Sequence, residues 1–454
     1  MEFPLFQVPY LGNGMTIALN AVLHVIISHG LAIGAVAIAA LGEYLGVRKA
    51  SRDWEGFSRD LLKVLIIIIT GVGAVTGAGI WFTISALSPR GIGSLLRVFF
   101  WPWFIEWLVF TAEVVVLLTY YFTWDRWTAE RKKQHVYLGF SYVIFASLSG
   151  FLITGILGFM LTSDGWPWDK SFWSAFFNPS FAPQLLVRFG ISFAIGGMFA
   201  AAYLLFSRRD SDFRRRALPL LGKITLFAVL SIPLFTWWYF AVVPSRFKTQ
   251  LISGLLTSHL SQHPEILFLA IGLTLAVTLG YALAATLGAV AGARLLVIPA
   301  LVLAFGFVAA FERGREFIRG PYLMPGYLYT NQVLLQENPY LNRAGMLDNA
   351  YWANLLADPD VLQQGAFLFA QNCSACHTIG GLNDIRARLK GRSQDGIYVF
   401  LTHTSDLVPV MPPFSGTTEE RRIAARFLYR LAAGKIAPAP PSRYSPLPVE
   451  KGHE

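Results

Sequence analysis

Residues 14–45 read GMTIALNAVLHVIISHGLAIGAVAIAALGEYL, an apolar run long enough to cross a bilayer core about 30 Å thick. Similar runs follow at approximately 61–87, 98–123, 135–161, 184–206, 218–240, 265–290 and 294–311. Backbone amides cannot be left unpaired in hydrocarbon, so each run is expected to be a helix. The sequence therefore predicts an all-α, polytopic membrane bundle of about eight spans.

The composition of the whole chain agrees with a membrane protein. Of 454 residues, 54% are hydrophobic and only 14% are charged, whereas soluble domains carry about 25% charged residues. These values exclude a disordered chain and a nucleic-acid-binding module, and they disfavour an ordinary soluble enzyme. A net charge of +10 on so apolar a chain indicates basic loops at a membrane surface.

Lysine and arginine are distributed unequally over the loops. They concentrate in the loops between runs one and two, three and four, and five and six. The positive-inside rule makes these loops cytoplasmic and puts both termini outside. The chain is therefore expected in a bacterial inner membrane with both ends on the periplasmic side. The start, MEFPLFQVPYLGNG, lacks a basic region, so the first run is expected to stay in the mature protein.

The amino-acid composition of the sequence changes after the eighth apolar run. Residues 1–320 are predicted to form the membrane domain, and 321–357, rich in Gly, Pro, Tyr and Asn, to form a linker. Residues 358–435 are predicted to form a small soluble domain of short helices. The proline-rich stretch 436–454 is predicted to be a tail.

The only cysteines of the chain stand three apart and are followed by a histidine. Cys373, Cys376 and His377 form CxxCH, the attachment signature of c-type haem. The two thiols add to the two vinyl groups of one porphyrin, and the histidine then reaches the iron from one face. The alternative, half of a zinc site, lacks a second pair of ligands. The motif therefore predicts one covalent haem c.

The soluble domain resembles the class I cytochromes c. Gly365 and Phe369 precede the cysteines in that family's GxxxFxxxCxxCH pattern, and VPVMPPFSG contains a methionine at Met411. The resemblance implies that Met411 is the distal ligand, so that a thioether and the His377 imidazole would hold the iron of an electron carrier. His403 is the rival candidate, interpreted here as a surface residue. The segment ERRIAARFLYRLA resembles the family's C-terminal helix.

Ionisable side chains also lie inside the apolar runs. The first run contains His24 and His29, and the third contains Glu106 and Glu113, whose separation of seven puts them on one helix face. At 1.5 Å per residue, His24 and Glu106 both lie roughly 12 Å below the outer boundary. Such residues predict haem ligands, a proton path or both. The alternative is buried polar pairs that hold helices together, and His135, which opens the fourth run, is interpreted as structural.

The eight-run region, roughly the first 320 residues, resembles subunit I of the cytochrome bd quinol oxidases. ALNAVLHVIISHGLAIG matches the family helix with a haem-ligating histidine, which implies this role for His24. FIEWLVFTAEV matches a pair of glutamates that serve the high-spin haem and its proton supply. Glu106 would thus be an iron ligand and Glu113 part of the proton route, both with catalytic roles. The segment ERGREF matches a motif that makes Glu312 a further ligand, although its Gln-Pro-Trp part is lost. The resemblance implies haem b, haem d or both.

Several departures from this family concern its quinol-oxidising end. Val187 stands where the family's low-spin haem ligand is a histidine, and the loop after the sixth run is short. The cytochrome c domain replaces the family's ninth span. His259 and His263 could serve a further haem, although an interfacial polar role is the simpler interpretation. We therefore expect the c haem to replace quinol as the point of electron entry.

Three functions stay open at this stage. The first is a cytochrome bd-like oxidoreductase that reduces oxygen with electrons from the c haem. The second is a non-catalytic electron-transfer subunit of a larger respiratory complex, and the third is an anchor that has lost its inner haems. The expected partners are other membrane subunits, periplasmic electron carriers and the lipid bilayer, with no nucleic acid.

Overall fold

A computed structural model describes the protein at residues 6–163, 165–248, 264–319, 324–349, 360–408 and 411–436. Within these ranges the chain is nearly all helical and forms no β-strand beyond isolated bridges. Eight helices or joined helices are long and apolar enough to cross a membrane in the described part of the chain. The all-α class and the predicted number of spans are therefore confirmed. The eight are Asn13–Lys49, Arg52–Leu87, Phe100–Phe122, Lys132–Phe159, Phe172–Phe206, Ser211–Val242, Phe268–Thr286 and Val290–Glu312.

The first two spans each combine α-helices with a π-helical segment, and shorter helices lie in the loops. The elements of the membrane part are α1 (Asn13–Val25), η1 (Ile26–Ala35), α2 (Val36–Lys49), α3 (Arg52–Ile68), η2 (Ile69–Gly73), α4 (Ala74–Leu87), α5 (Pro89–Val98), α6 (Phe100–Phe122), η3 (Trp124–Arg126), η4 (Ala129–Arg131), α7 (Lys132–Phe159), α8 (Trp166–Asp169), α9 (Phe172–Phe176), α10 (Phe181–Phe206), α11 (Ser211–Val242), α12 (Ser245–Lys248), α14 (Pro264–Thr286) and α15 (Val290–Arg319). The remaining helices are α16 (Asn338–Ala344), α17 (Val361–Asn372), α18 (Ile385–Leu389), α19 (Gln394–Thr402), α20 (Thr404–Leu407) and α21 (Thr418–Ala432).

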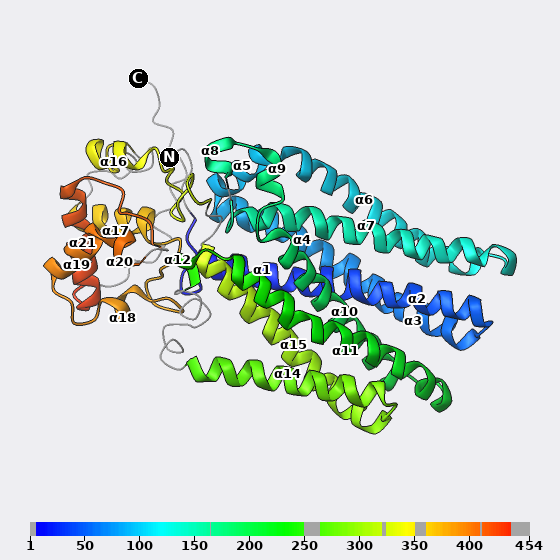
Figure 1. Cartoon of the computed structure of the whole chain (residues 1–454). Helices are drawn as coiled ribbons and strands as arrows, with labels where there is room; N and C mark the ends of the chain where they lie inside the picture. Colours follow the sequence, from blue (N-terminus) through cyan, green and yellow to red (C-terminus); the bar gives the residue numbers. More distant parts are fainter. Residues whose placement is uncertain are drawn as a thin grey trace, which may run out of the picture.

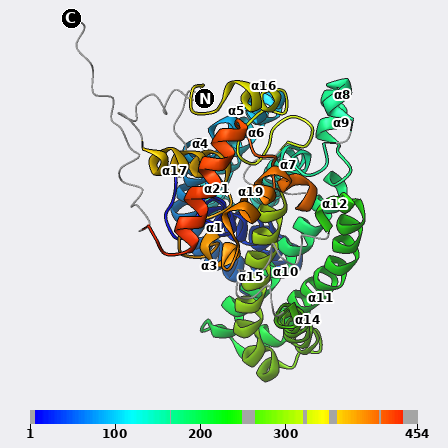
Figure 2. The same cartoon turned by 90° about the vertical axis from the view of Figure 1, so that its left-hand side faces the viewer.

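The long helices run side by side, and helices α17 to α21 sit together at one end of the bundle (Figure 1). Figure 2 looks onto this end, with α19 and α21 in front of the membrane helices. We call it the capped end and the opposite end the open end. The first residues of α1 reach the capped end, where Leu382 N–H donates to the Tyr10 carbonyl at 2.9 Å.

Helix boundaries differ from the predicted runs mainly where a helix begins or ends with charged residues. Helix α3 begins at Arg52, well before the apolar run at 61–87, because its first turns are amphipathic and bury Trp54 and Phe57. Helix α15 likewise continues past Glu312 to Arg319. Hydropathy finds the part of a helix that lies in hydrocarbon, and it leaves out the turns that extend into water.

Close contact between η1 and α10 forms the centre of the bundle. A Cβ atom added at Gly34 would overlap the backbone of Ser192, and one added at Gly196 would overlap the backbone of Gly34. Glycine at both positions lets the two backbones approach, as small residues do in other pairs of membrane helices. The absence of side chains at these two positions allows the backbones of η1 and α10 to pack closely.

The domain at the capped end is built on the crossing of α17 and α21. Gly365 packs against the Phe427 ring, where a side chain on residue 365 would collide with it. Helix α21 starts with a capping box in which Thr417 and Glu420 each bond to the other's backbone N–H. Glu420 also accepts from Met346 N–H at 3.0 Å and from Leu347 N–H at 2.6 Å. This carboxylate therefore joins the linker to the domain.

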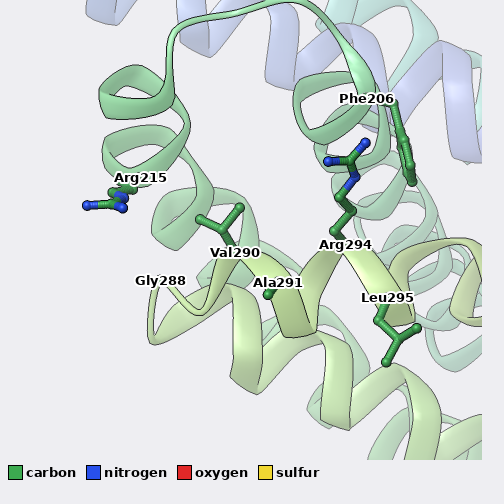
Figure 3. A pocket seen from close by; sticks show the side chains of 7 residues that line it. All are labelled: Phe206, Arg215, Gly288, Val290, Ala291, Arg294 and Leu295. Carbon is green, nitrogen blue, oxygen red and sulfur yellow. The ribbon is translucent and has the colours of Figure 1, made fainter.

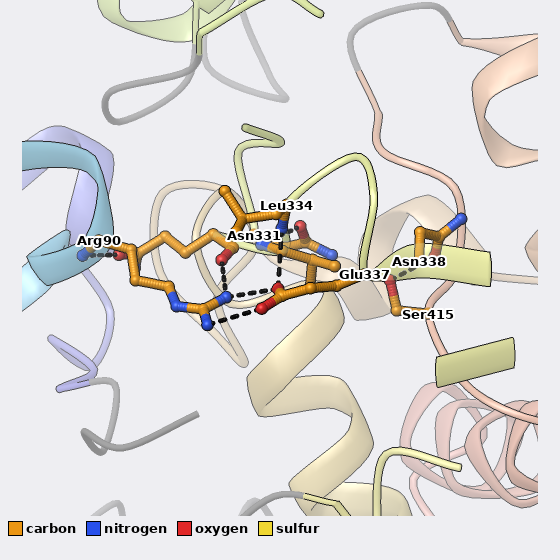
Figure 4. A network of polar contacts seen from close by, with 8 residues as sticks. Arg90, Asn331, Leu334, Glu337, Asn338 and Ser415 are labelled. Carbon is orange, nitrogen blue, oxygen red and sulfur yellow. Dashed lines mark hydrogen bonds and ion pairs between the residues drawn. The ribbon is translucent and has the colours of Figure 1, made fainter. Parts of the chain in front are cut away.

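The described part of the predicted linker, residues 324–349, contacts both parts of the protein (Figure 4). On the membrane side, the Arg90 guanidinium of α5 binds the Glu337 carboxylate and the Gln332 carbonyl. On the other side, Ser415 Oγ donates to Asn338 Oδ1 at 2.7 Å. The segment thus acts as a folded bridge, whereas the domain boundaries proposed from the sequence stay predictions.

A cavity of about 950 Å³ opens at the open end, between the α10–α11 and α14–α15 turns (Figure 3). The Arg294 guanidinium lies 5.0 Å from the centre of the Phe206 ring there. The cavity is lined by Phe206, Arg215, Gly288, Val290, Ala291, Arg294 and Leu295. It lies at the opposite end of the bundle from α17, the helix that precedes the CxxCH motif.

Candidate functional site

The CxxCH motif follows α17 directly and coils through a single turn. Asp360 caps the start of this helix by accepting a hydrogen bond from Gln363 N–H at 2.7 Å. At the other end, the N–H groups of Cys376 and His377 both donate to the Cys373 carbonyl, at 3.1 and 2.9 Å. The turn thereby directs both cysteines and the histidine into one cavity.

This cavity has a volume of about 330 Å³ and mostly apolar walls. Burial lowers the pKa of His377 to about 4, and the positive charge of Arg388 adds to the effect. The imidazole Nδ1 is buried without a hydrogen-bond partner. Burial raises the pKa of Cys373 to about 12, with a further contribution from Cys376. A neutral imidazole that lines the same cavity as two thiols fits a covalently attached haem.

Met411 lines the same cavity as His377, together with Pro412 and Pro413. Its loop is anchored by a hydrogen bond of 2.8 Å from Thr404 Oγ1 to the Pro412 carbonyl. His403, in contrast, keeps 55% of its side chain exposed and pairs with Asp406. The geometry favours Met411 over His403 as the distal ligand, and this assignment stays a prediction.

His24 lies on α1 and faces the second span. Its Nδ1 is 3.3 Å from the Gly73 carbonyl and 3.3 Å from Thr76 Oγ1. A Cβ atom at Gly77 would lie 3.1 Å from the His24 ring, so the glycine leaves room for it. With Nδ1–H donating to a backbone carbonyl, Nε2 carries the lone pair, which is the tautomer in which histidines commonly bind metals. His24 is therefore chemically able to hold a haem iron.

Both glutamates of the third span face α7. Glu106 Oε1 accepts a hydrogen bond from Ser149 Oγ at 2.9 Å, and Glu113 Oε1 accepts one from the Tyr142 hydroxyl at 3.0 Å. The two carboxylates share one helix face, as a spacing of seven residues requires. Each is paired with a hydroxyl group, which can pass on a proton as well as hold a helix.

Glu312 lies among different neighbours, in a small cavity between η1, α10 and α15. The polar residues that line this cavity with it are His29, Gln184 and Arg188. The Arg188 guanidinium donates to His29 Nε2 at 2.8 Å, and His29 Nδ1 lies 2.9 Å from Ser28 Oγ. Arginine has no acceptor atom, so His29 is the acceptor and its Nε2 lone pair is engaged. His24 and Glu106 thus have different immediate partners, and neither of them lines the cavity that contains Glu312.

Known proteins resemble both parts of this arrangement. Residues 14–243 match the family described as cytochrome bd terminal oxidase subunit I. The chain belongs to this family. Residues 360–428 match the family described as cytochrome c oxidase, cbb3-type, subunit III. The bd oxidase from Geobacillus thermodenitrificans shares the fold, with a TM-score of 0.56 and 20% identity over 69% of this chain and 88% of that chain. No curated protein gives a significant match.

Membership of the bd subunit I family establishes the class of protein to which the chain belongs. Together with the cytochrome c domain, it makes the chain a haem-binding protein of respiratory electron transfer and an oxidoreductase component. The eight spans make it a multi-pass membrane protein.

Val187, predicted from the sequence to occupy the position of the family's low-spin haem ligand, lies inside the bundle. Val187 is only 2% exposed and packs in the hydrophobic core. The next residue, Arg188, donates a hydrogen bond to His29 Nε2. A valine side chain offers no lone pair to iron. His259 and His263 lie outside the described residues.

The sequence interpretation overlooked the partners of the polar residues it selected. Tyr142 and Ser149 lie seven residues apart on α7, and this spacing, equal to that of the glutamates, could have identified them. It also overlooked a buried group formed by Glu43, Tyr120 and His135 at the open end. The signal that could have identified this group is Glu43, a carboxylate inside the first apolar run.

Proposed function

We propose that the chain is the oxygen-reducing subunit of a bacterial respiratory complex, with a covalent haem c as its electron entry. The residues proposed to hold haem c are Cys373, Cys376, His377 and Met411. Those proposed to hold haem b, haem d or both in the membrane are His24, Glu106 and Glu312. Bound haem would supply the change of redox state and the position at which oxygen binds, while the protein supplies ligands, position and protons.

The observation that carries this proposal is the contact between the CxxCH turn and α1, the helix of His24. A Cβ atom at Gly14 would lie 3.8 Å from the carbonyl oxygen of Ala375, between the two cysteines. Ten residues separate Gly14 from His24, which corresponds to about 15 Å along a helix. An electron could cover such a distance within the capped half of the bundle, without crossing the membrane.

The valine at position 187, where the resemblance implies a ligand of the low-spin haem, also supports entry of electrons through haem c. A quinol oxidase needs a haem near the quinol, and Val187 cannot serve as its ligand. Arg188 and His29 bind each other at this place. Without a low-spin haem to accept electrons from quinol, the cytochrome c domain at the capped end is the remaining electron donor within the chain.

The proposed orientation puts the capped end on the periplasmic side of the inner membrane, where periplasmic electron carriers could reduce haem c. The open end would then be cytoplasmic. Its turns carry the basic residues that the positive-inside rule requires there. Resemblance to the related oxidases adds a second membrane subunit as the expected partner.

The second candidate is an electron relay without oxygen chemistry. It is favoured by the change in the motif that begins at Glu312, where Glu316 and Phe317 replace Gln and Pro. A relay needs haems and short distances, whereas oxygen reduction also needs an open coordination position and a proton supply.

Two measurements on the complex purified from native membranes test these alternatives. An inventory of haems by type gives one c-type haem plus at least one membrane haem if either function is correct. A c-type haem alone would leave the chain only an anchoring role. Oxygen consumption with reduced cytochrome c as donor then separates the two, because a relay consumes none and lacks a haem that binds carbon monoxide.

A further inference from the structure

Three helices meet around one buried carboxylate at the open end of the bundle. Glu43 of α2, Tyr120 of α6 and His135 of α7 are all fully buried. They come from three separate spans, and the nearest described cation, Lys132, keeps 12% of its side chain exposed. Ionisable groups are costly inside a membrane protein and usually serve a function there.

Every polar atom in this group has a partner. Glu43 Oε1 lies 2.6 Å from His135 Nδ1, and Glu43 Oε2 accepts from the Tyr120 hydroxyl at 2.8 Å. His135 Nε2 lies 2.9 Å from the backbone carbonyl of Tyr120. A carbonyl can only accept, so Nε2 carries a hydrogen. The bond between Nδ1 and Oε1 then holds one further proton, which can reside on the imidazole or on the carboxyl group.

Lys132 stands between this proton and the surface of the open end. Its ammonium group is 3.4 Å from Glu43 Oε1, donates to the Trp124 carbonyl at 3.2 Å, and lies 4.5 Å from the centre of the Trp124 ring. When the proton leaves the pair, the carboxylate and the neutral Nδ1 face each other with lone pairs. The Lys132 ammonium is the charge that faces the carboxylate in that state.

Polar residues continue from this group along the interface between α6 and α7, at regular intervals on both helices. Tyr120, Glu113 and Glu106 are spaced by seven residues on α6, and on α7 the same spacing separates His135, Tyr142 and Ser149. The helices are antiparallel, and each α6 residue contacts its partner on α7: Tyr120 with His135, Glu113 with Tyr142, and Glu106 with Ser149. Seven residues correspond to about 10 Å along a helix. At each level a hydroxyl group donates to a carboxylate.

We propose that Glu43 and His135 hold a transferable proton and form the entrance, at the open end, of the proton path that leads through Glu113 toward the haem site proposed at Glu106. The inference rests on the proposed function, because oxygen reduction takes up one proton for each electron. A spacing of seven residues follows from the packing of two helices and would also suit a structural cluster. What favours a path for protons is that each of the three levels pairs a carboxylate with a hydroxyl donor inside the membrane domain.

The main test compares Glu43→Gln with the wild-type complex in sealed proteoliposomes. Glutamine keeps the shape and removes the acid, and Glu130→Gln, at an exposed position in the neighbouring loop, is the matched control. With haem spectra unchanged, E43Q is expected to slow oxygen consumption and proton uptake from the open-end side by about tenfold or more. E130Q should behave as wild type. Unaltered rates in an E43Q complex with intact haems would overturn the proposal.

A second measurement needs no oxygen chemistry and survives a failure of E43Q to assemble. The infrared bands of carboxyl and carboxylate groups are followed as pH is changed. Tyr120→Phe removes only the hydroxyl that donates to Glu43, so the bands that shift in Y120F are those of Glu43, whether the shared proton resides on the carboxyl group or on His135. If no band that shifts in Y120F changes with pH, the pair gives up no proton and the entrance lies elsewhere. If such a band changes with pH while the wild type consumes no oxygen, the proposed function fails and the proton site stands.

Discussion

Replacing Arg90 by alanine is expected to loosen the folded bridge at residues 324–349. The guanidinium donates to the two carboxylate oxygens of Glu337 at 2.6 and 2.9 Å and to the Gln332 carbonyl at 3.1 Å. Hydrogen bonds to charged groups contribute about 1.5–3 kcal/mol. Both side chains are 32% exposed, so water screens the pair and the lower end applies. A loss of about 1.5 kcal/mol corresponds to roughly tenfold more frequent opening of the segment.

Hydrogen–deuterium exchange measures this opening directly. The amides of Tyr329 and Leu335 bond within the segment, to the carbonyls of Val333 and Tyr327, and should exchange about tenfold faster in R90A. Arg90→Lys keeps the charge but loses the paired donors, so it should fall between wild type and R90A. Arg97→Ala, an exposed change on the same helix, is the control.

The effect of Arg90 also depends on pH. Burial on its own would raise the pKa of Glu337, but the Arg90 hydrogen bonds and the Leu334 N–H outweigh it and lower the pKa below 4.5. The stabilisation is therefore complete above pH 4.5 and is lost as pH falls through the lowered value. A double-mutant cycle with Glu337→Ala should give a coupling energy of about 1 kcal/mol or more at neutral pH. A coupling near zero, or equal acceleration in R97A, would refute the assignment of the bridge to this ion pair.

Three further changes test other parts of the site. His24→Ala should remove a b- or d-type absorbance and leave the c-type spectrum intact; an unchanged membrane-haem spectrum would exclude His24 as a ligand. Met411→Ala should lower the haem c reduction potential and open its sixth coordination position, as shown by binding of added imidazole, whereas the same result from His403→Ala would reverse the assignment. Glu420→Ala removes the capping box and two acceptors for linker amides, and should lower the thermal unfolding temperature of the cytochrome domain through a loss of about 2 kcal/mol. A melting curve equal to wild type would contradict it.

The sequence was sufficient for the features that depend on composition or on a short motif. Apolar runs determine spans because hydrocarbon permits only helices, and the CxxCH spacing is fixed by the chemistry of one porphyrin. The face shared by Glu106 and Glu113 also followed from their separation along one helix. Each of these inferences needs only residues that are close in sequence.

Contacts between distant residues were beyond such reasoning. Nothing near Glu43 in the sequence indicates His135, because helix packing across three spans brings them together. The same is true of Arg188 and His29, and of Arg90 with Glu337. The π-helical segment that contains His29 was equally unexpected, since a change of helical turn depends on packing against neighbours and leaves little trace in hydropathy.

The attachment of the haem-binding domain to the capped end affects how electron supply would respond to conditions. The bridge and the bond from Leu382 to Tyr10 replace a collision between two separate proteins by an arrangement already in place. Transfer inside such a unit is first-order, so dilution of the protein does not slow it. Added salt, which weakens encounters between oppositely charged partners, would then act only on the outside donor that reloads the domain.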